Sequence, residues 1–324
     1  MSDVRILSTA PLRGEGLERL RMLGEVVVDP WIDHSPLRLY NSEQLAERVR
    51  AEGADVVICE ADSCKGPLFE LPLVAIGSTR GDPTNVDLAG ATAAGIPVLR
   101  APGRNADAVA ELAVGLALAA SRRIVPADRD VRDGEVYRDG SIPYQRFRGW
   151  QLAGRTAGVV GLGAVGRAAA WRLEGLGMRV ISADPFAPDA THDLDDLLAE
   201  SDLVTMHAAV TPDTVGLISA ERVARMKPGA VYVNTARAAL HDLDALTEAA
   251  GSGRLAALAL DHFEGEHLAP DHPLTGLPNV VLTPHIGGAT YDTEANHTTQ
   301  MADGLETLLQ GGTPPNLANP EVRQ

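Results

Sequence analysis

The stretch TAGVVGLGAVGRAAAWRLEGLGMRVISAD, residues 156–184, decides the fold of this chain. The apolar run at residues 157–160 predicts a strand that is buried on both faces, and a helical pattern follows that ends at Gly177. A second apolar run, residues 180–181, leads directly to the acidic Asp184. Strand, glycine-rich turn, helix, strand and acid in this order are typical of a dinucleotide-binding unit.

Each glycine of the turn stands where a dinucleotide site needs one. Gly161 permits the tight turn, Gly163 lets the backbone approach a pyrophosphate, and Gly166 lets the helix pack closely on the strand. Ala164 and Val165 complete the turn at the helix N-terminus, where free N–H groups and the helix dipole favour phosphate. A lone GxGxxG is weak support, but here the strand, the helix and the acid agree with it.

Asp184 predicts which cofactor the unit takes. It follows the glycines at the distance where a carboxylate can accept hydrogen bonds from both ribose hydroxyls. The same charge would repel a 2′-phosphate, so we expect NAD, and NADP is disfavoured.

Composition excludes several classes of partner. The net charge of −16 argues against binding to nucleic acid or to an anionic membrane, since both need basic faces. Cys59 and Cys64 form neither a CxxC motif nor a disulfide framework, which is typical of a cytoplasmic protein. The N-terminus lacks the apolar core of a signal peptide, and no apolar stretch reaches membrane-spanning length. An anionic small substrate is still possible, because a few local arginines can outweigh the overall charge.

The first hundred residues predict a small parallel α/β domain, and 324 residues suffice for two domains. Expected strands are residues 4–8, 25–28, 56–58, 73–76 and 97–99, and expected helices are residues 17–23 and 42–51, the latter with Ser42 as N-cap. Loops at residues 60–64 and 77–82 follow strand ends, where open α/β sheets place ligands.

The pattern changes at Asn105, which precedes a long apolar helix over residues 106–123. Residues 125–150 are polar and irregular and predict an arm that packs on a partner or on this helix. After Asp184 we expect helices at residues 194–200 and 293–310, and strands at residues 203–206, 230–233, 255–260 and 280–282. Polar residues follow strand after strand, so we expect them to converge on the cofactor: Asp184, His207, Asn234, Asp261 and His285.

Four segments together resemble the D-isomer-specific 2-hydroxyacid dehydrogenases, and the likeness covers nearly the whole chain. They are VGLGAVG at residues 160–166, MKPGAVYVNTAR at 226–237, LDHFEGE at 260–266 and LTPHIGG at 282–288. The chain looks like a phosphoglycerate dehydrogenase-like or hydroxypyruvate reductase-like member without a regulatory C-terminal domain. The resemblance implies a Rossmann-type nucleotide domain with a doubly wound parallel sheet, residues 103–289. This domain would be inserted into a smaller flavodoxin-like α/β substrate domain, residues 1–102 and 290–324.

The family's catalytic trio maps onto Arg237, Glu266 and His285. The resemblance implies reduction of a 2-keto acid, in which a hydride goes to C2 and a proton to the carbonyl oxygen. His285 suits the proton step, because histidine titrates near neutral pH. Glu266 would hold its other ring nitrogen, and Arg237 would bind the substrate carboxylate with a planar, permanently charged fork.

The resemblance also implies contacts beyond the trio and a homodimer. Cofactor contacts are expected at Gly161, Gly163, Ala164, Val165, Gly166, Asp184, His207, Thr235, Ala236, Arg237, Asp261, His285, Gly287 and Gly288. Substrate contacts are expected at Ser78, Thr79, Arg80, Gly81, Asn105 and Arg237. For His207 a hydrogen-bonded strand-end residue, and for Arg80 a surface charge, are equally acceptable interpretations.

Departures from the family pattern leave the substrate open. Glu60 stands where phosphoglycerate-type members carry an arginine, which disfavours 3-phosphoglycerate unless Arg80 or an arginine of the arm compensates. Formate is disfavoured, because formate dehydrogenases have glutamine at the place of Glu266.

Two other interpretations of these residues are weaker. His262, His267 and His272 with Asp271 could suggest a metal cluster, but they lack ligand spacing on one helix face, so no metal is expected. The C-terminal-binding-protein corepressors resemble the same family, so an NAD-sensing binding protein is the alternative function. A peptide groove or a long interaction tail would favour it, and the chain shows no such tail.

Overall fold

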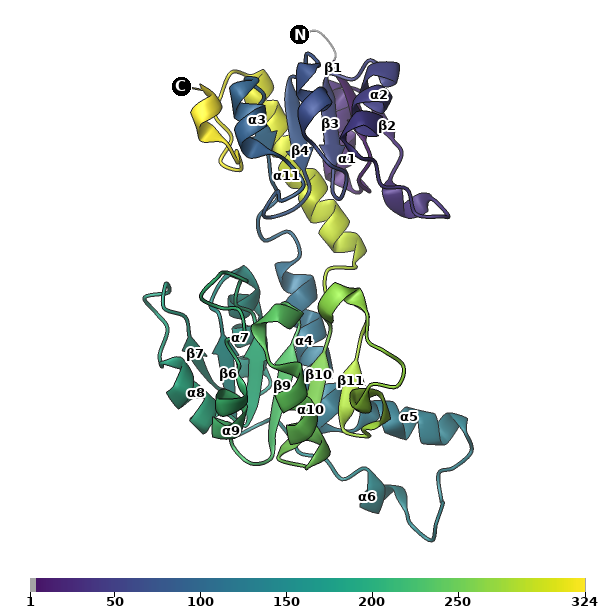
Figure 1. Ribbon diagram of the computed structural model, residues 1–324, viewed down its shortest axis with the longest axis vertical. Helices are drawn as coiled ribbons and strands as arrows, with labels where there is room; N and C mark the ends of the chain where they lie inside the picture. The colour runs from purple at the N-terminus through teal and green to yellow at the C-terminus, as the bar shows by residue number, and fades with distance from the viewer. Residues whose placement is uncertain (1–3, 324) are drawn as a thin grey trace. The chain divides into compact units, whose positions relative to one another are not determined.

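The chain forms two compact units in this computed structural model, which describes residues 4–323 (Figure 1). The first unit contains the residues up to Asn105 and those from Thr290 onward, and the second is Ala106–Ala289. The sequence placed these boundaries at residues 103 and 290. The N-terminal unit therefore receives its last helix from the far end of the chain.

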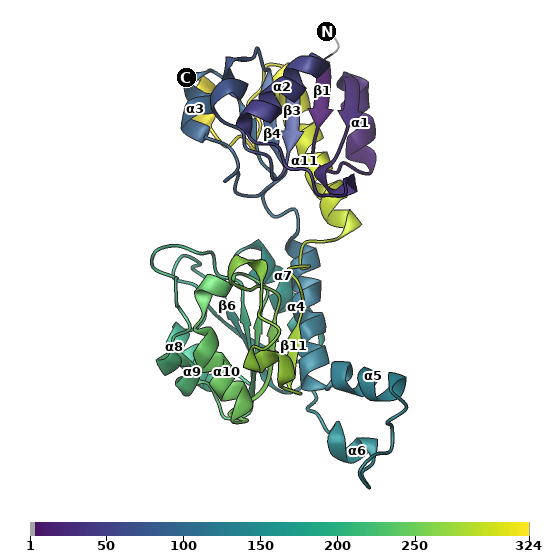
Figure 2. The ribbon, with the colours of Figure 1, turned by 45° about the vertical axis from the view of Figure 1, so that its right-hand side comes forward.

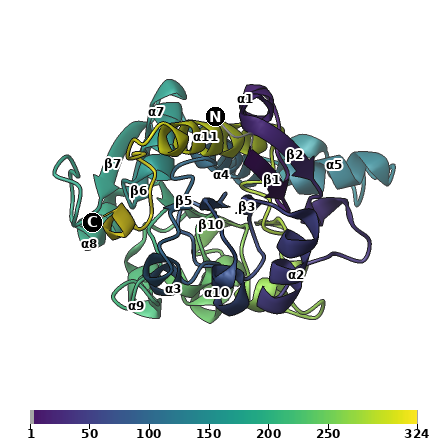
Figure 3. The same cartoon turned by 90° about the horizontal axis from the view of Figure 1, so that it is seen from above.

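The first unit is a five-stranded parallel sheet with helices on both faces. Its strands are β1 (Val4–Ser8), β2 (Gly24–Val28), β3 (Val56–Cys59), β4 (Ala75–Ser78) and β5 (Val98–Leu99), in the spatial order β2-β1-β3-β4-β5. Its helices are α1 (Glu15–Leu23), α2 (Ser42–Glu52), α3 (Leu88–Ala93) and α11 (Tyr291–Leu309). Figure 3 shows α1 and α11 on one side of the sheet and α2 and α3 on the other. This strand order is the flavodoxin-like one.

Two details of the first unit correct the sequence analysis. Ser42 is not the N-cap of α2, because Asn41 has the extended backbone of a cap and accepts a hydrogen bond from Gln44 N at 2.9 Å. The Gln44 side chain accepts in turn from Asn41 N at 3.1 Å, which completes a capping box. The fourth strand, expected at residues 73–76, lies at residues 75–78, where it pairs with β3 from Val56↔Ala75 onward.

The second unit is a six-stranded parallel sheet in the order β11-β10-β9-β8-β6-β7. Its strands are β6 (Thr156–Val160), β7 (Arg179–Ala183), β8 (Leu203–Met206), β9 (Ala230–Asn234), β10 (Leu255–Leu260) and β11 (Val280–Leu282). On one face pack α4 (Ala106–Ser121) and α7 (Ala164–Gly175), and on the other α8 (Leu194–Glu200), α9 (Ala220–Arg225) and α10 (Leu243–Gly251). The residues of β6, β8 and β9 are buried throughout, as expected for a parallel sheet covered on both faces.

The switch point of this sheet lies between β6 and β8. The chain leaves β6 towards β7 on one side and then returns to place β8 on the other side of β6. Loops at the carboxyl ends of two such neighbours diverge and leave a crevice, which is where open α/β sheets bind ligands. The glycine turn and His207 follow these two strands.

Residues 125–150 are not irregular throughout, as the sequence had suggested. They contain most of α5 (Ile124–Arg132) and all of α6 (Pro143–Arg146), and this segment extends away from the sheet of the second unit (Figure 2). Arg146 ties the segment together, since its guanidinium donates to Asp130 Oδ2 and to the carbonyl of Val136. The many glycines and charges had hidden these short helices.

Among residues 4–323, no helix combines the length and apolar character needed to cross a bilayer.

Candidate active site

The glycine turn between β6 and α7 presents backbone atoms that no side chain covers. Gly161 has φ of 88°, and a Cβ there would lie 2.5 Å from Ala208 N. A Cβ on Gly166 would lie 1.9 Å from Gly161 O, so α7 can pack here only without a side chain. A Cβ on Gly163 would meet no atom within 4 Å. Gly163 therefore faces open space, which fits an approach by a cofactor diphosphate to the N-terminus of α7, where Ala164 and Val165 lie.

Asp184 closes the turn on the side of β7. Its Oδ2 accepts from Leu162 N at 2.7 Å, and its Oδ1 accepts from Phe186 N at 2.9 Å. The carboxylate therefore lies beside the glycine turn.

Two polar atoms around this crevice are buried without a hydrogen-bond partner among the residues that the structure describes. They are His207 Nδ1, after β8, and Thr235 Oγ1, after β9. His207 Nε2 is used by Thr205 Oγ1 at 2.9 Å, and burial lowers the pKa of the imidazole to about 4, so the ring is neutral at pH 7. Buried polar groups are rarely left unpaired, so these two atoms fit a polar ligand in the crevice.

Asn234 shapes the loop that carries Arg237. Its Oδ1 accepts from Ala236 N at 2.8 Å, and its Nδ2 donates to Arg237 O at 2.9 Å and to His241 Nδ1 at 2.8 Å. Burial lowers the pKa of His241 to about 4, which keeps Nδ1 free to accept. The side chain of Arg237 is exposed and donates from NH1 to the Ala236 carbonyl at 2.6 Å.

Asp261 holds the loop after β11 in place. It is fully buried, and its Oδ1 accepts from Thr283 Oγ1 at 2.6 Å and from Ile286 N at 2.9 Å, while Oδ2 accepts from Gly287 N at 2.9 Å. Its carbonyl accepts from His285 N at 2.8 Å. Both carboxylate oxygens are thus used within the protein, and the turn at Gly287 and Gly288 follows.

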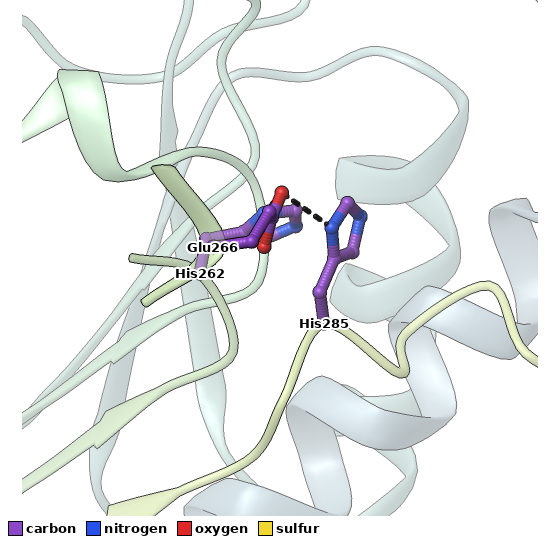
Figure 4. Close-up of side chains that lie close together, drawn as sticks. All are labelled: His262, Glu266 and His285. Atoms are coloured by element: carbon purple, nitrogen blue, oxygen red, sulfur yellow. Dashed lines mark hydrogen bonds and ion pairs between the residues drawn. The ribbon is translucent and has the colours of Figure 1, made fainter. Parts of the chain in front are cut away.

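His285 and Glu266 form a hydrogen-bonded pair at the edge of the sheet (Figure 4). His285 Nδ1 lies 2.8 Å from Glu266 Oε1, and both side chains are roughly half exposed. Both residues have left-handed backbone, with φ of 55° and 56°. Such a conformation is costly for non-glycine residues, and the hydrogen bonds around Asp261 hold it at His285. Among the described residues His285 Nε2 has no partner, so it is the nitrogen available for proton transfer.

His262 joins this pair to Arg237. Its ring is 4 % exposed, and its centroid lies 3.7 Å from that of His285 at an interplanar angle of 51°. His262 Nε2 lies 3.4 Å from Arg237 NH1, and Nδ1 lies 3.9 Å from Glu266 Oε1. The sequence analysis considered His262 only as a possible metal ligand. Its place four residues before Glu266 and directly after Asp261 was the available signal.

His262, Glu266 and His285 also form a group whose ligating atoms lie within 4.8 Å of one another. His267, His272 and Asp271 are not part of it. Arg237 already donates to His262, and its fixed positive charge would repel a divalent cation at this place. The group is therefore better suited to moving a proton than to holding a metal.

In the first unit, Glu60 is paired internally. Its carboxylate accepts from Arg104 through Oε1 and from Trp31 Nε1 through Oε2 at 3.2 Å. Burial raises the pKa of this carboxyl, but the Arg104 cation outweighs burial and the pKa lies below its usual value. The arginine that compensates Glu60 within this unit is thus Arg104, which the sequence analysis did not consider.

His297 of α11 completes this cluster. Its Nδ1 lies 2.8 Å from Arg104 NH1, and its Nε2 lies 2.7 Å from the Pro11 carbonyl. Because arginine can only donate, Nδ1 accepts and Nε2–H donates to Pro11. Burial above all, with a contribution from Arg104, lowers the pKa of His297 to about 4, in agreement with a neutral ring.

The other expected substrate residues of this unit differ in availability. Ser78 and Thr79 are buried, and their hydroxyls contact Asn85 and Arg104. Arg80 is half-buried, donates to the carbonyl of Glu60 at 2.6 Å and has no carboxylate partner among the described residues. Among the expected substrate residues of the first unit, Arg80 is therefore the one whose guanidinium is available to bind an anion. Gly81 lies in the same loop, and Asn105 is half-buried at the end of the unit.

Comparison with known proteins gives one consistent family. Residues 114–287 match the family described as D-isomer specific 2-hydroxyacid dehydrogenase, NAD binding domain. A glyoxylate reductase of Thermofilum pendens is 37% identical over 336 residues, which cover 99% of this chain and 96% of that protein. A D-3-phosphoglycerate dehydrogenase of Archaeoglobus fulgidus is 36% identical over 319 residues, 95% of this chain but 58% of that longer protein.

A solved structure shares the fold over nearly the whole chain. The TT0316 protein from Thermus thermophilus superposes with a TM-score of 0.81 at 36% identity, and the alignment covers 97% of this chain and 99% of that one. The segment that matches the family contains the glycine turn, Arg237, Glu266 and His285. This chain is a member of the D-isomer-specific 2-hydroxyacid dehydrogenase family, with the NAD-binding domain and the Rossmann-like fold of that family.

Proposed function

We propose that this protein is an NAD-dependent enzyme that interconverts a small 2-keto acid and its D-2-hydroxy acid. The observation that carries the proposal is the 2.8 Å contact between His285 Nδ1 and Glu266 Oε1, with Arg237 linked to the same group through His262. A proton donor, its carboxylate partner and a carboxylate-binding cation are the groups that reduction of a 2-keto acid needs.

His285 is proposed to donate the proton through Nε2. In the charged ring, Nδ1–H faces Glu266 and Nε2–H faces outward, so the proton on Nε2 can pass to the carbonyl oxygen of the substrate. The ring that remains is the neutral Nδ1–H tautomer, which the same Glu266 oxygen continues to hold. Bound NADH supplies the two electrons and the hydrogen that go to C2. In the direction of oxidation, His285 takes up the hydroxyl proton.

NAD is proposed over NADP because of Asp184. Its carboxylate lies against the glycine turn, and there it would accept from ribose hydroxyls and repel a 2′-phosphate. Gly161, Gly163 and Gly166 would hold the diphosphate, and His207 Nδ1 and Thr235 Oγ1 are the buried groups that still lack partners among the described residues.

Arg80 is a further proposed substrate contact, since its guanidinium has no carboxylate partner among the described residues. Glu60 does not decide against a phosphorylated substrate, because Arg104 already balances its charge. Relatives named glyoxylate reductase and D-3-phosphoglycerate dehydrogenase support testing both small and phosphorylated keto acids.

We further propose that the enzyme is a cytoplasmic homodimer. The segment of α5 and α6 exposes several apolar side chains, namely Ile124, Val125, Val131, Tyr137, Ile142, Tyr144 and Trp150. An exposed apolar group of this size is typical of a protein interface. Light scattering of the purified protein would give the mass of one chain if this proposal is wrong.

The test is NADH oxidation by the purified protein with a panel of 2-keto acids. The panel contains glyoxylate, hydroxypyruvate, 3-phosphohydroxypyruvate, pyruvate, 2-ketoglutarate and branched 2-keto acids, each also with NADPH. His285→Ala should lower turnover by about 10²–10⁴, the usual contribution of acid–base catalysis, and should leave NADH binding intact. The exposed His267 makes a matched control, and His267→Ala should behave as the wild type. Equal turnover in the His285 variant would contradict the assignment.

A further inference from the structure

His262 contacts both Arg237 and His285, although it belongs to neither of their loops. Arg237 follows β9, His262 follows β10 and His285 follows β11, so the three side chains come from three neighbouring strands of one sheet. Each of the three loops carries one of them, and His262 is the buried residue in the middle. Figure 4 shows its ring beside Glu266 and His285.

The contact with Arg237 fixes the chemical form of His262. A guanidinium has only N–H donors, so Nε2 of His262 must accept and must carry no proton. The neutral ring then has its hydrogen on Nδ1, on the side of Glu266 Oε1. Burial, followed by the charges of His285 and Arg237, lowers the pKa of His262 to about 4, which agrees with a ring that stays neutral while His285 changes its charge.

The contact with His285 is of a different kind. The two ring centroids are 3.7 Å apart, so the buried ring of His262 packs against the exposed ring of His285. Because the ring of His262 is buried, it limits the movement of the ring of His285. His285 therefore has two restraints on its side chain, the hydrogen bond with Glu266 and the face of His262. Among the described residues, the Arg237 side chain is hydrogen-bonded to the carbonyl of Ala236 and to Nε2 of His262.

We infer that His262 is a positioning residue that holds the carboxylate-binding group, Arg237, and the proton donor, His285, in one fixed arrangement. This inference rests on the proposed function. The carboxylate and the carbonyl of a 2-keto acid are adjacent, so the two protein groups that meet them must be set relative to one another. A misplacement of about 1 Å in such a pair can lower the rate about 10²-fold.

Two substitutions separate the two contacts. His262→Phe keeps an aromatic ring packed against His285 but removes the nitrogen that accepts the hydrogen bond from Arg237. We expect KM for the keto acid to rise about tenfold or more, while kcat changes less, since the lost hydrogen bond is made to a charged group. In His262→Gln the side-chain oxygen can still accept a hydrogen bond from Arg237, but the ring that packs against His285 is lost. We expect kcat to fall about tenfold and KM to stay within about twofold, because the rate depends steeply on the position of the proton donor.

The control is His267→Phe, which makes the same chemical change at an exposed histidine five positions along the chain. We expect it to match the wild type. Melting temperature and the Kd for NADH are measured for all three variants, as is the Kd for oxamate, which presents a carboxylate without being reduced. The Kd for oxamate should follow KM. The same fall in kcat and the same rise in KM in both His262 variants, together with a lower melting temperature, would overturn the inference. An unchanged KM in His262→Phe would also overturn it.

A spectroscopic arm does not depend on turnover. Nitrogen NMR of the histidine rings should show His262 as the neutral Nδ1–H tautomer from pH 8 to about pH 5, because its pKa lies at about 4, and Arg237→Met should change its Nε2 signal. An Nε2–H tautomer in the wild type would overturn the inference even if the enzyme is active. If the wild type reduces no keto acid of the panel, the proposed function fails, and this arm still decides whether His262 accepts a hydrogen bond from Arg237.

Discussion

Replacement of Asp261 by asparagine should disturb His285, the proposed proton donor, more than it disturbs cofactor binding. Asp261 is fully buried and accepts three hydrogen bonds, from Thr283 Oγ1, Ile286 N and Gly287 N. An amide has one accepting oxygen in place of two. If the amide oxygen of the asparagine takes the place of Oδ1, its NH2 group faces Gly287 N, and two hydrogen-bond donors then face each other. If the amide is turned the other way, Thr283 Oγ1 and Ile286 N lose their acceptor instead.

The magnitude follows from these contacts. One hydrogen bond to a charged group is worth about 1.5–3 kcal/mol, and a buried N–H left unpaired costs a similar amount. We therefore expect Asp261→Asn to weaken the loop of residues 283–287 by about 3 kcal/mol. His285 has a left-handed φ of 55°, so a released loop can relax its backbone and move the ring away from Glu266. A shift of about 1 Å would lower kcat/KM about 10²-fold.

The assay joins hydrogen exchange with kinetics. A loss of about 3 kcal/mol corresponds to amide exchange about 150-fold faster at Ile286 and Gly287, provided that these amides exchange by local opening. The Kd for NADH should change less than kcat/KM. Thr283→Val, which removes one of the three donors and leaves the carboxylate, should have a much smaller effect. Unchanged exchange with a large loss of NADH affinity would refute the reasoning and make Asp261 a direct cofactor contact.

Three further predictions concern the cofactor turn and acid stability. Gly166→Ala places a Cβ 1.9 Å from Gly161 O, so it should lower the free energy of unfolding by about 1–3 kcal/mol and also weaken NADH binding. Gly163→Ala meets open space, so it should weaken NADH binding without lowering stability. Urea denaturation measures the stability and NADH fluorescence the binding, and unchanged binding in both variants would mean that the turn holds no cofactor. Asp184→Arg removes the carboxylate beside Leu162 N and should shift the ratio of kcat/KM for NADH and NADPH towards NADPH; a constant ratio would mean that Asp184 does not read the ribose. Burial lowers the pKa of His241 from 6.5 to about 4, so as the pH falls the unfolded chain takes up the proton before the folded chain does. The contribution of His241 to stability is therefore complete above about pH 6.5 and is lost as the pH falls towards 4, by about 3 kcal/mol. Urea denaturation from pH 7.5 to 4.5 should show a shallower decline of stability in His241→Leu than in the wild type, and an equal decline would contradict the explanation.

Local pattern was sufficient for most of the architecture. Fully apolar runs bounded by glycine and polar residues predicted the strands at residues 203–206, 255–260 and 280–282 as the structure has them. Short amphipathic helices with weak patterns were missed, among them α3, α9 and α10. The N-cap of α2 was assigned one residue too late, because Asn41 and Ser42 are both good capping residues and only the backbone conformation distinguishes them.

The sequence by itself determined the glycine turn, because it depends on residue type at a fixed spacing along one strand–turn–helix unit. Four local motifs also indicated the family fold, and the resemblance that they carry proposed the trio of Arg237, Glu266 and His285. The sequence could not determine which side chains meet across strands, since that depends on the order β11-β10-β9 and on how each loop turns. Only the tertiary structure placed His262 between Arg237 and His285, and gave Arg104 to Glu60. Contacts between residues far apart in sequence are set by packing and by the pairing of buried polar groups, and neither leaves a periodic signal in the chain.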